Sequence, residues 1–491
     1  MNWQGTAKKS CLFLLLMLLG IIFICLVSTS LVQAAQIACT PATIRVALGL
    51  NLTSVDFFVS EGNYELVDCL TQRVISSDLF TGTWVVAPAG SANIQIYNNG
   101  QPLEGLGSSL LLLRQKNDQE QNVFCFGKKN YRGNLLLENI QGKIHAINYL
   151  DVEQYLYGVV GAEMGPGAPE EAYKAQAVVS RTYAFYSKEH PQLNYDLGIS
   201  TQWQVYGGYD TEILSSPLVK KAVDETRGQV ICYDRELIQA FFHSNSGGYT
   251  EACENVWLES LPYLQPIVTP EDVVAMQVAQ NLSWTAETYL WEKSFSRQEL
   301  MNQLEKWNRA HPNNAVNVGE IYDLSVKRWA VDPQTKEFLA KETASGRVTQ
   351  LSFTGSKGAK SFYRDMIRSV LGLRSTLFEV ICNSTVKIWN AFGSLDFYSY
   401  TKDLKAVNAD GYITALNGNN EEYYVLGADG LQTIPKVFSE VTFKGKGYGH
   451  GLGMSQWGAW GMALRGAKYD EIIEHFYNQD KNDGRLRIQA Y

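Results

Sequence analysis

Residues 155–186, which read YLYGVVGAEMGPGAPEEAYKAQAVVSRTYAFY, constrain the fold more than any other stretch of the chain. An apolar tract runs into a Gly/Pro turn, and a helix is predicted to begin after Gly167. Pro169 suits the first turn of a helix, and Glu170 and Glu171 complement the helix dipole there. The chain must therefore bury an apolar segment close to a helix that carries cations.

One acidic residue, Glu163, lies within the apolar tract. Its neighbours Val159, Val160, Ala162 and Met164 would remove water from the ionised carboxylate, so its pKa is expected to rise. A carboxylic acid that stays protonated near neutral pH can act as a general acid. The alternative is an ordinary Glu at a strand end that faces water.

Two cations of the predicted helix, Lys174 and Arg181, are seven residues apart, so they share one helix face. Such a face can simply be solvated. It can also line a cleft with Glu163, where a cation would hold a sugar carboxylate or an N-acyl oxygen.

Length and charge narrow the class of protein. A chain of 491 residues is expected to form two or three domains. Its net charge of -8 argues against a nucleic-acid partner. The 27 Tyr and 11 Trp residues suit sugar-binding grooves, but they suit β-rich cores as well.

The N-terminus predicts export. Lys8 and Lys9 precede an apolar run, 11–27, and small residues follow it up to Ala34 and Ala35. Residues 1–35 are therefore predicted to be a signal peptide or an N-terminal membrane anchor. In both cases the remainder of the chain is exported.

Cysteine spacing gives no metal-binding pattern. Six of the eight cysteines lie outside the apolar run and show no CxxC spacing, so a zinc ribbon is not expected. Cys232 and Cys253 are the pair nearest in sequence. Disulfides and isolated buried thiols both remain open.

The remaining pattern predicts an α+β fold. Short alternating runs separated by Gly, Asn and Asp predict a β-rich domain over 36–150. Residues 151–268 and 439–491 are expected to form two parts of a catalytic core, with an α+β insertion over 269–438. Hairpins are predicted to turn at Gln141-Gly142 and at Asp234-Arg235.

Helix boundaries can also be predicted. A helix is expected to start near Ser296, another to end near Gly372, and a third to close at Gly466. Asp470 is predicted to be the N-cap of a last helix. Three apolar residues of that helix are expected to face inward: Ile472, Ile473 and Phe476.

Two polar loops are candidate parts of a site. Residues 243–257 follow a strand that is predicted to be buried, and a buried strand often delivers polar side chains to a functional loop. His243, Ser246 and Glu251 lie in this segment around a glycine pair. A serine hydrolase elbow is excluded because G-x-S-x-G is absent. The loop can also simply cap itself.

The second loop is rich in glycine. His450 lies among alternating glycines between 445 and 453, and Ser455 and Gln456 follow. Glycine permits close backbone approach to a ligand. We expect a functional reason here, because no folding requirement accounts for that density.

Three separated blocks resemble one family. YLYGVVGAEM with AYKAQAVVSRTYA, then FFHSNSGGYTE with ENVW and LPYL, then GYGHGLGMSQWGA are similar to the SpoIID/LytB family of bacterial cell-wall proteins. The resemblance implies a lytic transglycosylase of sporulating cells. Such proteins cut peptidoglycan between N-acetylmuramic acid and N-acetylglucosamine, prefer strands stripped of stem peptides, and work with an amidase and a membrane scaffold during engulfment.

The resemblance also implies residue roles. The family's catalytic acid falls on Glu163 and its helix cations fall on Lys174 and Arg181. Further substrate-binding residues are expected at Tyr206, His243, Ser246, Glu251, His450, Ser455 and Gln456.

One departure from the family concerns metal. Some members carry a zinc cluster of Cys and His where this chain has Gly198, Gln202 and Trp203, none of which is a normal zinc ligand. No structural zinc and no cofactor are therefore expected. The terminus FYNQDKNDGRL is also atypical for the family.

The implied reaction needs only one carboxyl group, because the attacking hydroxyl belongs to the muramic sugar itself. Two alternatives remain open. One is a non-catalytic glycan-binding protein that enhances an amidase. The other is a hydrolytic muramidase with Glu251 or Glu254 as a second carboxylate.

Overall fold

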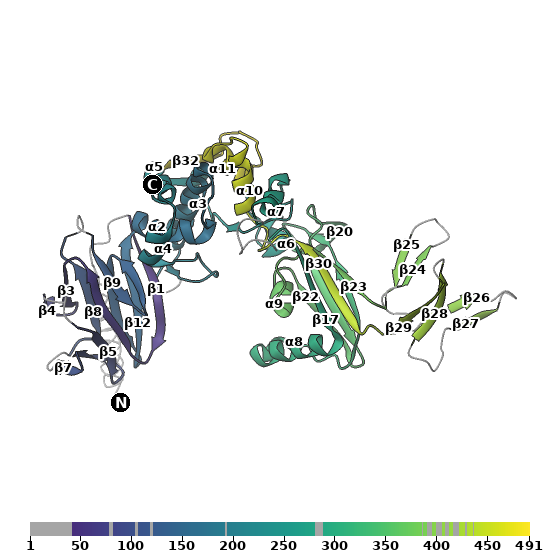
Figure 1. Ribbon diagram of the computed structural model, residues 1–491, viewed down its shortest axis with the longest axis horizontal. Helices are drawn as coiled ribbons and strands as arrows, with labels where there is room; N and C mark the ends of the chain where they lie inside the picture. The colour runs from purple at the N-terminus through teal and green to yellow at the C-terminus, as the bar shows by residue number, and fades with distance from the viewer. Residues whose placement is uncertain are drawn as a thin grey trace, which may run out of the picture. The chain divides into compact units, whose positions relative to one another are not determined.

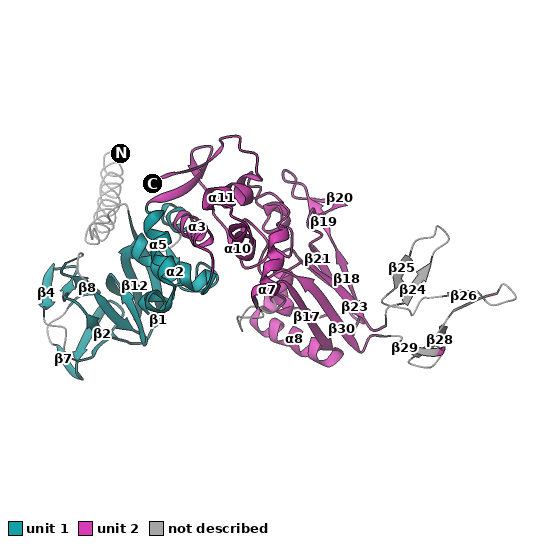
Figure 2. Cartoon of the chain, turned by 45° about the horizontal axis from the view of Figure 1, so that its top comes forward, with its two compact units in different colours: residues 1–167, 183–227 teal, residues 168–182, 228–491 magenta. Residues whose placement is uncertain are grey.

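The computed structural model describes residues 42–491 except 78–81, 104–106, 118–120, 192–193, 280–287 and short stretches between 385 and 436. Two compact units form: unit 1 is Met1–Gly167 with Tyr183–Arg227, and unit 2 is Ala168–Thr182 with Gly228–Tyr491 (Figure 2). The predicted signal segment lies outside the described residues. Within the described residues, no helix combines the length and apolar character needed to cross a bilayer.

Unit 1 is built mainly on two sheets (Figure 1). One sheet has the order β13-β1-β12-β11-β8-β3-β4 and the other β10-β9-β2-β5-β6-β7. Their strands are β1 (Thr43–Leu52), β2 (Val55–Glu61), β3 (Tyr64–Asp68), β4 (Arg73–Ser76), β5 (Trp84–Ala89), β6 (Asn93–Asn98), β7 (Gln101–Leu103), β8 (Leu110–Gln115), β9 (Val123–Phe126), β10 (Lys129–Arg132), β11 (Asn134–Ile140), β12 (Lys143–Asp151) and β13 (Leu197–Gly198).

The alternation of buried and partly exposed residues explains why these segments form strands. Every second residue of β11 is buried, so one face packs inward while the other is partly exposed. Gln141 and Gly142 both have positive φ, 53° and 82°, which suits a two-residue hairpin turn between β11 and β12. The predicted hairpin is confirmed.

Three helices of unit 1 follow the strands. They are α2 (Val152–Met164), α4 (Gly208–Leu214) and α5 (Pro217–Glu225). The side chain of Asp151 caps α2 by accepting from Glu153 N at 2.9 Å. The alternative that Glu163 lies at a strand end is therefore wrong, because the apolar tract is helical and Glu163 occupies its last turn.

Unit 2 combines small sheets with helices. Its helices are α6 (Cys253–Val256), η1 (Pro270–Val273), α7 (Val274–Ala279), α8 (Arg297–Ala310), η2 (Pro312–Asn314), α9 (Met366–Leu371), α10 (Gln456–Leu464) and α11 (Tyr469–Asn478). The helix α3 (Glu170–Glu189) contributes its first residues to unit 2 and its last to unit 1.

The strands of unit 2 form short sheets, with the orders β15-β14-β32, β16-β31, β17-β30-β23, β18-β21-β22 and β19-β20, and three further hairpins. They are β14 (Gln229–Tyr233), β15 (Glu236–Leu237), β16 (Phe242–His243), β17 (Leu290–Ser296), β18 (Ile321–Lys327), β19 (Trp329–Val331), β20 (Phe338–Glu342), β21 (Gln350–Gly355), β22 (Gly358–Tyr363), β23 (Phe378–Cys382), β24 (Val386–Trp389), β25 (Leu395–Tyr398), β26 (Lys405–Val407), β27 (Ile413–Ala415), β28 (Glu422–Gly427), β29 (Gly430–Pro435), β30 (Glu440–Lys446), β31 (Met454–Ser455) and β32 (Leu486–Ala490).

Several predicted boundaries in unit 2 are confirmed. Ser296 caps α8 in a capping box with Glu299. Gly372 ends α9 in the left-handed conformation, with φ 63°. Asp234 and Arg235 form the turn between β14 and β15, with φ 50° and 77°.

The predicted N-cap of the last helix is wrong. Helix α11 begins at Tyr469, so Lys468 takes the cap position and Asp470 lies in the first turn. The reason is tertiary: Glu171 accepts a hydrogen bond from Tyr469 N at 2.9 Å. The side chain of Glu471 accepts another from Lys468 N at 2.8 Å. The predicted inward-facing residues are confirmed, because Ile472, Ile473 and Phe476 are buried.

Unit 2 has two apolar cores. One surrounds β17, β30, β18 and β21, with α8 lying beside β17 (Figure 1). The other joins the first part of α3 to β14, α10 and α11. The five cysteines of the described residues are buried and form no disulfide, so Cys232 and Cys253 are not bonded to each other. The architecture is α+β, as predicted.

Candidate functional site

Glu163 lies half-buried in the last turn of α2. Gly165, with φ 66°, ends the helix directly after it, and its N–H donates to Gly161 O at 3.0 Å. One carboxylate oxygen of Glu163, Oε1, accepts from Val205 N at 2.6 Å. This backbone hydrogen bond fixes the orientation of the carboxyl group.

The segment around Val205 is itself anchored. Gly207 N donates to Gly158 O on α2 at 3.0 Å, and the Tyr206 hydroxyl donates to Asn148 Oδ1 on β12 at 3.0 Å. The approach is close because a Cβ at Gly158 would come within 2.7 Å of Gly208 O. This packing explains why the tract needs glycine at 158.

Tyr206 was expected to contact substrate, and the structure places it in the interior. It is 3% exposed, and its ring centroid lies 4.9 Å from that of Tyr155. Burial raises the pKa of Tyr206 well above its usual value. In this position Tyr206 holds the segment that orients Glu163.

The place of the family's zinc cluster is filled differently. The indole of Trp203 lies over Gly198, where a Cβ would meet Trp203 Cδ1 at 2.9 Å. Gln202 is exposed. These residues offer no imidazole or thiolate, so they do not fit zinc. Elsewhere in the described part of the chain, no group of three or more His, Cys, Asp or Glu residues could hold a metal ion.

The two helix cations, Lys174 and Arg181, lie in unit 2 and differ in burial and in their partners. Lys174 Nζ is 2.9 Å from Glu170 Oε1 and 3.2 Å from Glu171 Oε1, and its side chain is 14% exposed. Arg181 is fully buried, and its Nη1 donates to Gln229 O at 3.1 Å. The expectation that Arg181 lines an open cleft is not met, because its guanidinium lies within the packed interior of unit 2.

A carboxylate that sequence reasoning missed ties the two polar loops of unit 2 together. Asp272, on η1, is fully buried. Its carboxylate accepts from Ser246 N at 3.1 Å, Gly248 N at 3.0 Å and Thr269 Oγ1 at 2.9 Å, and also from Ser246 Oγ. Its other oxygen accepts from Ser455 Oγ at 2.5 Å.

Burial raises the pKa of Asp272, and these hydrogen bonds oppose that rise. Ser246 and Ser455, both expected to bind substrate, are instead fully buried partners of this carboxylate. Gln456, directly after Ser455, donates to Gln176 Oε1 on α3 at 3.4 Å.

The histidines of the two loops come together. Their ring centroids are 5.3 Å apart. His450 Nδ1 accepts from Leu452 N at 3.0 Å, so its Nε2–H donates to Phe242 O at 2.9 Å. His243 Nδ1 donates to Leu452 O at 3.0 Å. Each ring therefore braces backbone of the other loop.

Both histidines are held neutral. Burial lowers the pKa of His450 to about 4. It lowers the pKa of His243 well below its usual value, and the nearby His450 and Arg347 lower it further. The Nε2 atom of His243 is buried and has no hydrogen-bond partner among the residues that the structure describes.

Arg347 is a second residue that sequence reasoning missed. It is 1% exposed, and its Nη2 donates to Ser246 O at 2.7 Å. Burial lowers its pKa to about 10. Gly451, with φ 83°, lies against the guanidinium, and a Cβ there would come within 2.5 Å of Arg347 Cζ.

The glycine density of the second loop therefore has a folding reason, contrary to expectation. Gly453 has φ 65°, and a Cβ there would lie 1.9 Å from Phe241 O. Gly449 has φ 114°, and a Cβ there would lie 2.7 Å from His243 Cβ. Larger residues would push the two loops apart.

The carboxylates considered as second catalytic groups are buried in unit 2. Glu251 Oε1 accepts from Ala252 N at 2.9 Å and from Asn255 Nδ2 at 2.8 Å, and Oε2 accepts from Ser345 Oγ. Burial raises the pKa of Glu254, whose Oε2 has no hydrogen-bond partner within the described part of the chain.

The expected site residues thus form three groups. Glu163 and Tyr206 belong to unit 1. His243, Ser246, Glu251, His450 and Ser455 converge in unit 2 around Asp272 and Arg347. Lys174, Arg181 and Gln456 lie where α3 packs against β14, α10 and α11.

Comparisons with known proteins agree with the sequence motifs. A family model described as "Stage II sporulation protein" matches residues 140–233, which include α2, α3 and Glu163. The chain is 27% identical over 362 residues to an uncharacterized protein of Brachyspira hyodysenteriae, covering 73% of this chain and 74% of that protein.

Two further relatives carry functional names. The "Amidase enhancer" of Bacillus subtilis is 28% identical over 402 residues, covering 80% of this chain but only 50% of that protein. The "Stage II sporulation protein D" of Bacillus amyloliquefaciens is 25% identical over 348 residues, covering 68% of this chain and 74% of that protein. The motifs, their order and these matches agree in making the chain similar to proteins of the SpoIID/LytB family.

Proposed function

We propose that this protein is a peptidoglycan lytic transglycosylase that cleaves between N-acetylmuramic acid and N-acetylglucosamine in denuded glycan strands. The observation that carries the proposal is the setting of Glu163. This carboxyl group is half-buried among apolar residues of α2, and the Val205 N–H orients it at 2.6 Å. A general acid needs a fixed carboxyl group that a substrate can still reach.

In the proposed reaction, protonated Glu163 donates its proton to the bridging oxygen as the C1–O bond of the muramic sugar breaks. The resulting carboxylate then accepts the proton of the 6-hydroxyl of the same sugar while that oxygen bonds to C1. A 1,6-anhydro ring closes, and Glu163 is protonated again. No water is consumed, and the intramolecular nucleophile supplies an entropic advantage.

The other expected site residues divide by burial. Tyr206, Arg181, Ser246, Glu251 and Ser455 are buried, so we propose that they position the segments that bind glycan. Lys174 and Gln456 are partly exposed, so they are the better candidates for direct contact.

We further propose that the protein is exported and acts on the cell wall, in sporulation, together with an amidase and a membrane scaffold. The relatives named for stage II sporulation and for amidase enhancement support this setting. The match to the amidase enhancer covers half of that protein, so a shared role concerns only the common part.

A second candidate is a non-catalytic glycan-binding enhancer of an amidase. Two observations favour it: the amidase enhancer matches 80% of this chain, and most polar groups of the loops are engaged inside the fold. Such a protein would bind denuded glycan and raise amidase activity without cutting the strand.

Digestion of denuded glycan followed by mass spectrometry tests these candidates. Anhydro-muramic ends are expected from the wild type and not from Glu163→Gln. New reducing ends would instead indicate a hydrolytic muramidase. Intact strands together with a stimulated amidase would indicate the enhancer.

A further inference from the structure

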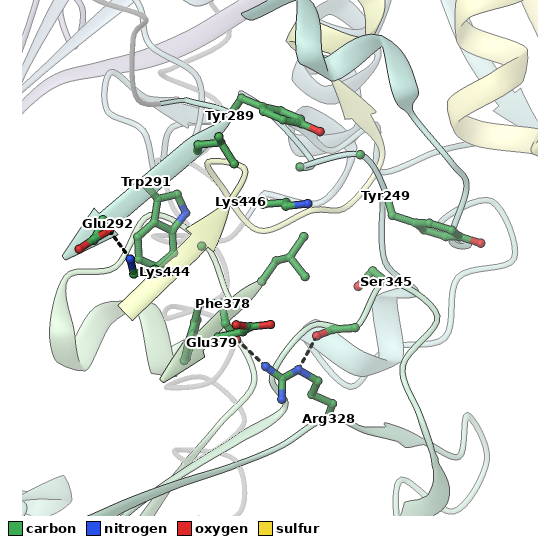
Figure 3. A pocket seen from close by; sticks show the side chains of 16 residues that line it. Tyr249, Tyr289, Trp291, Glu292, Arg328, Ser345, Phe378, Glu379, Lys444 and Lys446 are labelled. Carbon is green, nitrogen blue, oxygen red and sulfur yellow. Dashed lines mark hydrogen bonds and ion pairs between the residues drawn. The ribbon is translucent and has the colours of Figure 1, made fainter. Parts of the chain in front are cut away.

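Unit 2 contains a pocket of about 890 Å³ that adjoins the buried cluster around Asp272 and Arg347 (Figure 3). Its walls come from β17, β23 and β30, from Arg328 next to β18, and from the segments 247–249 and 345–346. All of these residues belong to unit 2. No residue expected from the sequence to bind substrate lines this pocket.

One wall of the pocket is rigid. Trp291 is 6% exposed, and its Nε1 donates to Ser375 Oγ at 3.3 Å. Its ring lies against Gly445, where a Cβ would come within 2.1 Å of the indole. Ser375 Oγ also donates to Lys446 O at 2.6 Å, which fixes the strand that carries Lys446. The pocket is therefore preformed.

Aromatic rings and a cation share the opening. Tyr249 and Tyr289 are half-buried and line the pocket, and in Figure 3 the Lys446 side chain extends between them. Aromatic side chains combined with a few placed polar groups are typical of pockets for small organic ligands. The flat face of a sugar ring suits such a lining.

The charges in the pocket are incompletely matched. Lys444 is paired with Glu292 at 3.1 Å. Arg328 donates only to backbone carbonyls, from Nε to Gly346 O at 2.9 Å and from Nη2 to Phe378 O at 2.6 Å. Carbonyl groups do not cancel its charge.

Lys446 has no hydrogen-bond or ion-pair partner for its amine among the described residues, and the same holds for the carboxylate of Glu379. Three cations and two carboxylates therefore line a pocket of a chain whose net charge is -8. This local excess of positive charge favours an acidic ligand.

We propose that this pocket binds an acidic sugar residue, whose carboxylate pairs with Lys446 and Arg328 while its ring packs against Tyr249 or Tyr289. The carboxylate of Glu379 accepts hydrogen bonds from the hydroxyl groups of the sugar. Resting on the proposed function, the sugar is N-acetylmuramic acid, because its lactyl carboxylate is free only after the stem peptide has been removed. The pocket then distinguishes a denuded strand from one that still carries peptides.

The test is a binding measurement with the full chain carrying Glu163→Gln, which prevents turnover. Calorimetry compares the disaccharide of N-acetylglucosamine and N-acetylmuramic acid with the same disaccharide whose lactyl carboxylate is converted to an amide. The acid is expected to bind about tenfold more tightly, as one charged hydrogen bond supplies. Equal affinity for the two compounds overturns the proposal.

Matched lysine variants locate the site. Lys446→Gln is expected to abolish the preference for the acid, and Lys446→Arg to retain it. Lys341→Gln, an exposed lysine of β20 outside the pocket, is expected to leave the preference unchanged. A Lys446→Gln variant that keeps the full preference overturns the proposal, and retention by Lys446→Arg shows that the fold survives substitution at this position.

The pocket assignment and the proposed lytic reaction can fail independently of each other. If the wild type forms anhydro products but Lys446→Gln discriminates normally, the pocket assignment fails and the reaction stands. If no anhydro products form but Lys446-dependent binding persists, the reaction fails and the pocket stands.

Discussion

Two carboxylates, Glu163 and Asp272, show how differently the two units use an acidic group. Glu163 is half-buried at a helix end, where Val205 N–H orients one oxygen. Asp272 is fully buried and accepts hydrogen bonds from two backbone N–H groups and three hydroxyl groups. A carboxylate surrounded by donors holds structure together, whereas one that a substrate can reach is available for proton transfer.

The comparison also concerns what surrounds each acid. The neighbours of Glu163 on α2 are apolar, and the segment that orients it is docked through backbone and Tyr206. The neighbours of Asp272 are serines and glycines from two distant loops. We therefore expect substitutions at Glu163 to change chemistry and substitutions at Asp272 to change stability.

The largest effect is expected from Glu163→Gln. Loss of a general acid should lower the rate of anhydro-product formation by about a thousandfold, since general acid–base catalysis contributes roughly 10²–10⁴-fold. Mass spectrometry of digested glycan measures the rate. The melting temperature should stay close to that of the wild type, because Gln can still accept from Val205 N. If Glu163→Gln lost as much stability as is expected for Asp272→Asn, Glu163 would have a structural role and the contrast with Asp272 would be wrong.

Asp272→Asn should destabilise unit 2 by about 3 kcal/mol, because the amide nitrogen cannot accept from the buried hydroxyl groups. Hydrogen exchange should accelerate in residues 244–248 and 451–455 while α2 remains protected. Asp470→Asn is the matched control: this exposed aspartate should change stability by less than about 0.5 kcal/mol. Unchanged exchange in both loops would contradict the role given to Asp272.

The neutral histidines predict a stability that depends on pH. His450 has a folded pKa of about 4 against an ordinary 6.5, so the unfolded chain takes up the proton first as pH falls. Its contribution is complete above pH 6.5 and is lost toward pH 4, by about 2 kcal/mol for this partly buried ring.

Melting curves at several pH values measure this loss, and His450→Gln should flatten the decline. Asp272 works in the opposite direction, because its raised pKa favours the folded state as pH falls. His243 adds to the decline, and the buried charge of Arg347 remains present throughout this range. A stability that rises from pH 6.5 to 4.5 in the wild type would refute the assignment for His450.

The smallest effect is expected at Lys174. Its ion pairs with Glu170 and Glu171 span four and three helix positions respectively, and such pairs are worth about 0.5 kcal/mol or less. Lys174→Gln should therefore barely change stability but lower product formation about tenfold, if its amine contacts glycan. Arg181→Gln should do the reverse, because Arg181 is buried. Equal losses of stability in the two variants would remove this distinction.

Features fixed by neighbouring residues could be predicted from the sequence. The cap at Ser296, the turn at Gln141-Gly142 and the end of α9 at Gly372 depend on residues within a few positions, and all three are confirmed. Glu163 could be singled out because an acid in an apolar tract is visible in the sequence.

The buried cluster that joins the two polar loops around Asp272 and Arg347 could not be predicted in the same way. Asp272 meets Ser455 across 183 positions, and Arg347 meets Ser246 across 101. Nothing local marks either residue, and the many glycines around His450 predict only a close backbone approach to a ligand. The glycines were attributed to a ligand because the buried arginine that requires Gly451 lies far away in the sequence. Asp470 failed as a cap for the same reason, since distant Glu171 binds the helix end.

The pairing of β32 with β14 has a practical consequence. Residues 486–490 cover one edge of β14 along its whole length, from Gln229 to Tyr233. Deleting these residues would leave that edge with unpaired amides and carbonyls, which can recruit a strand from another molecule. Shortened versions of the protein are therefore expected to self-associate, whereas a purification handle added beyond Tyr491 should leave the edge covered.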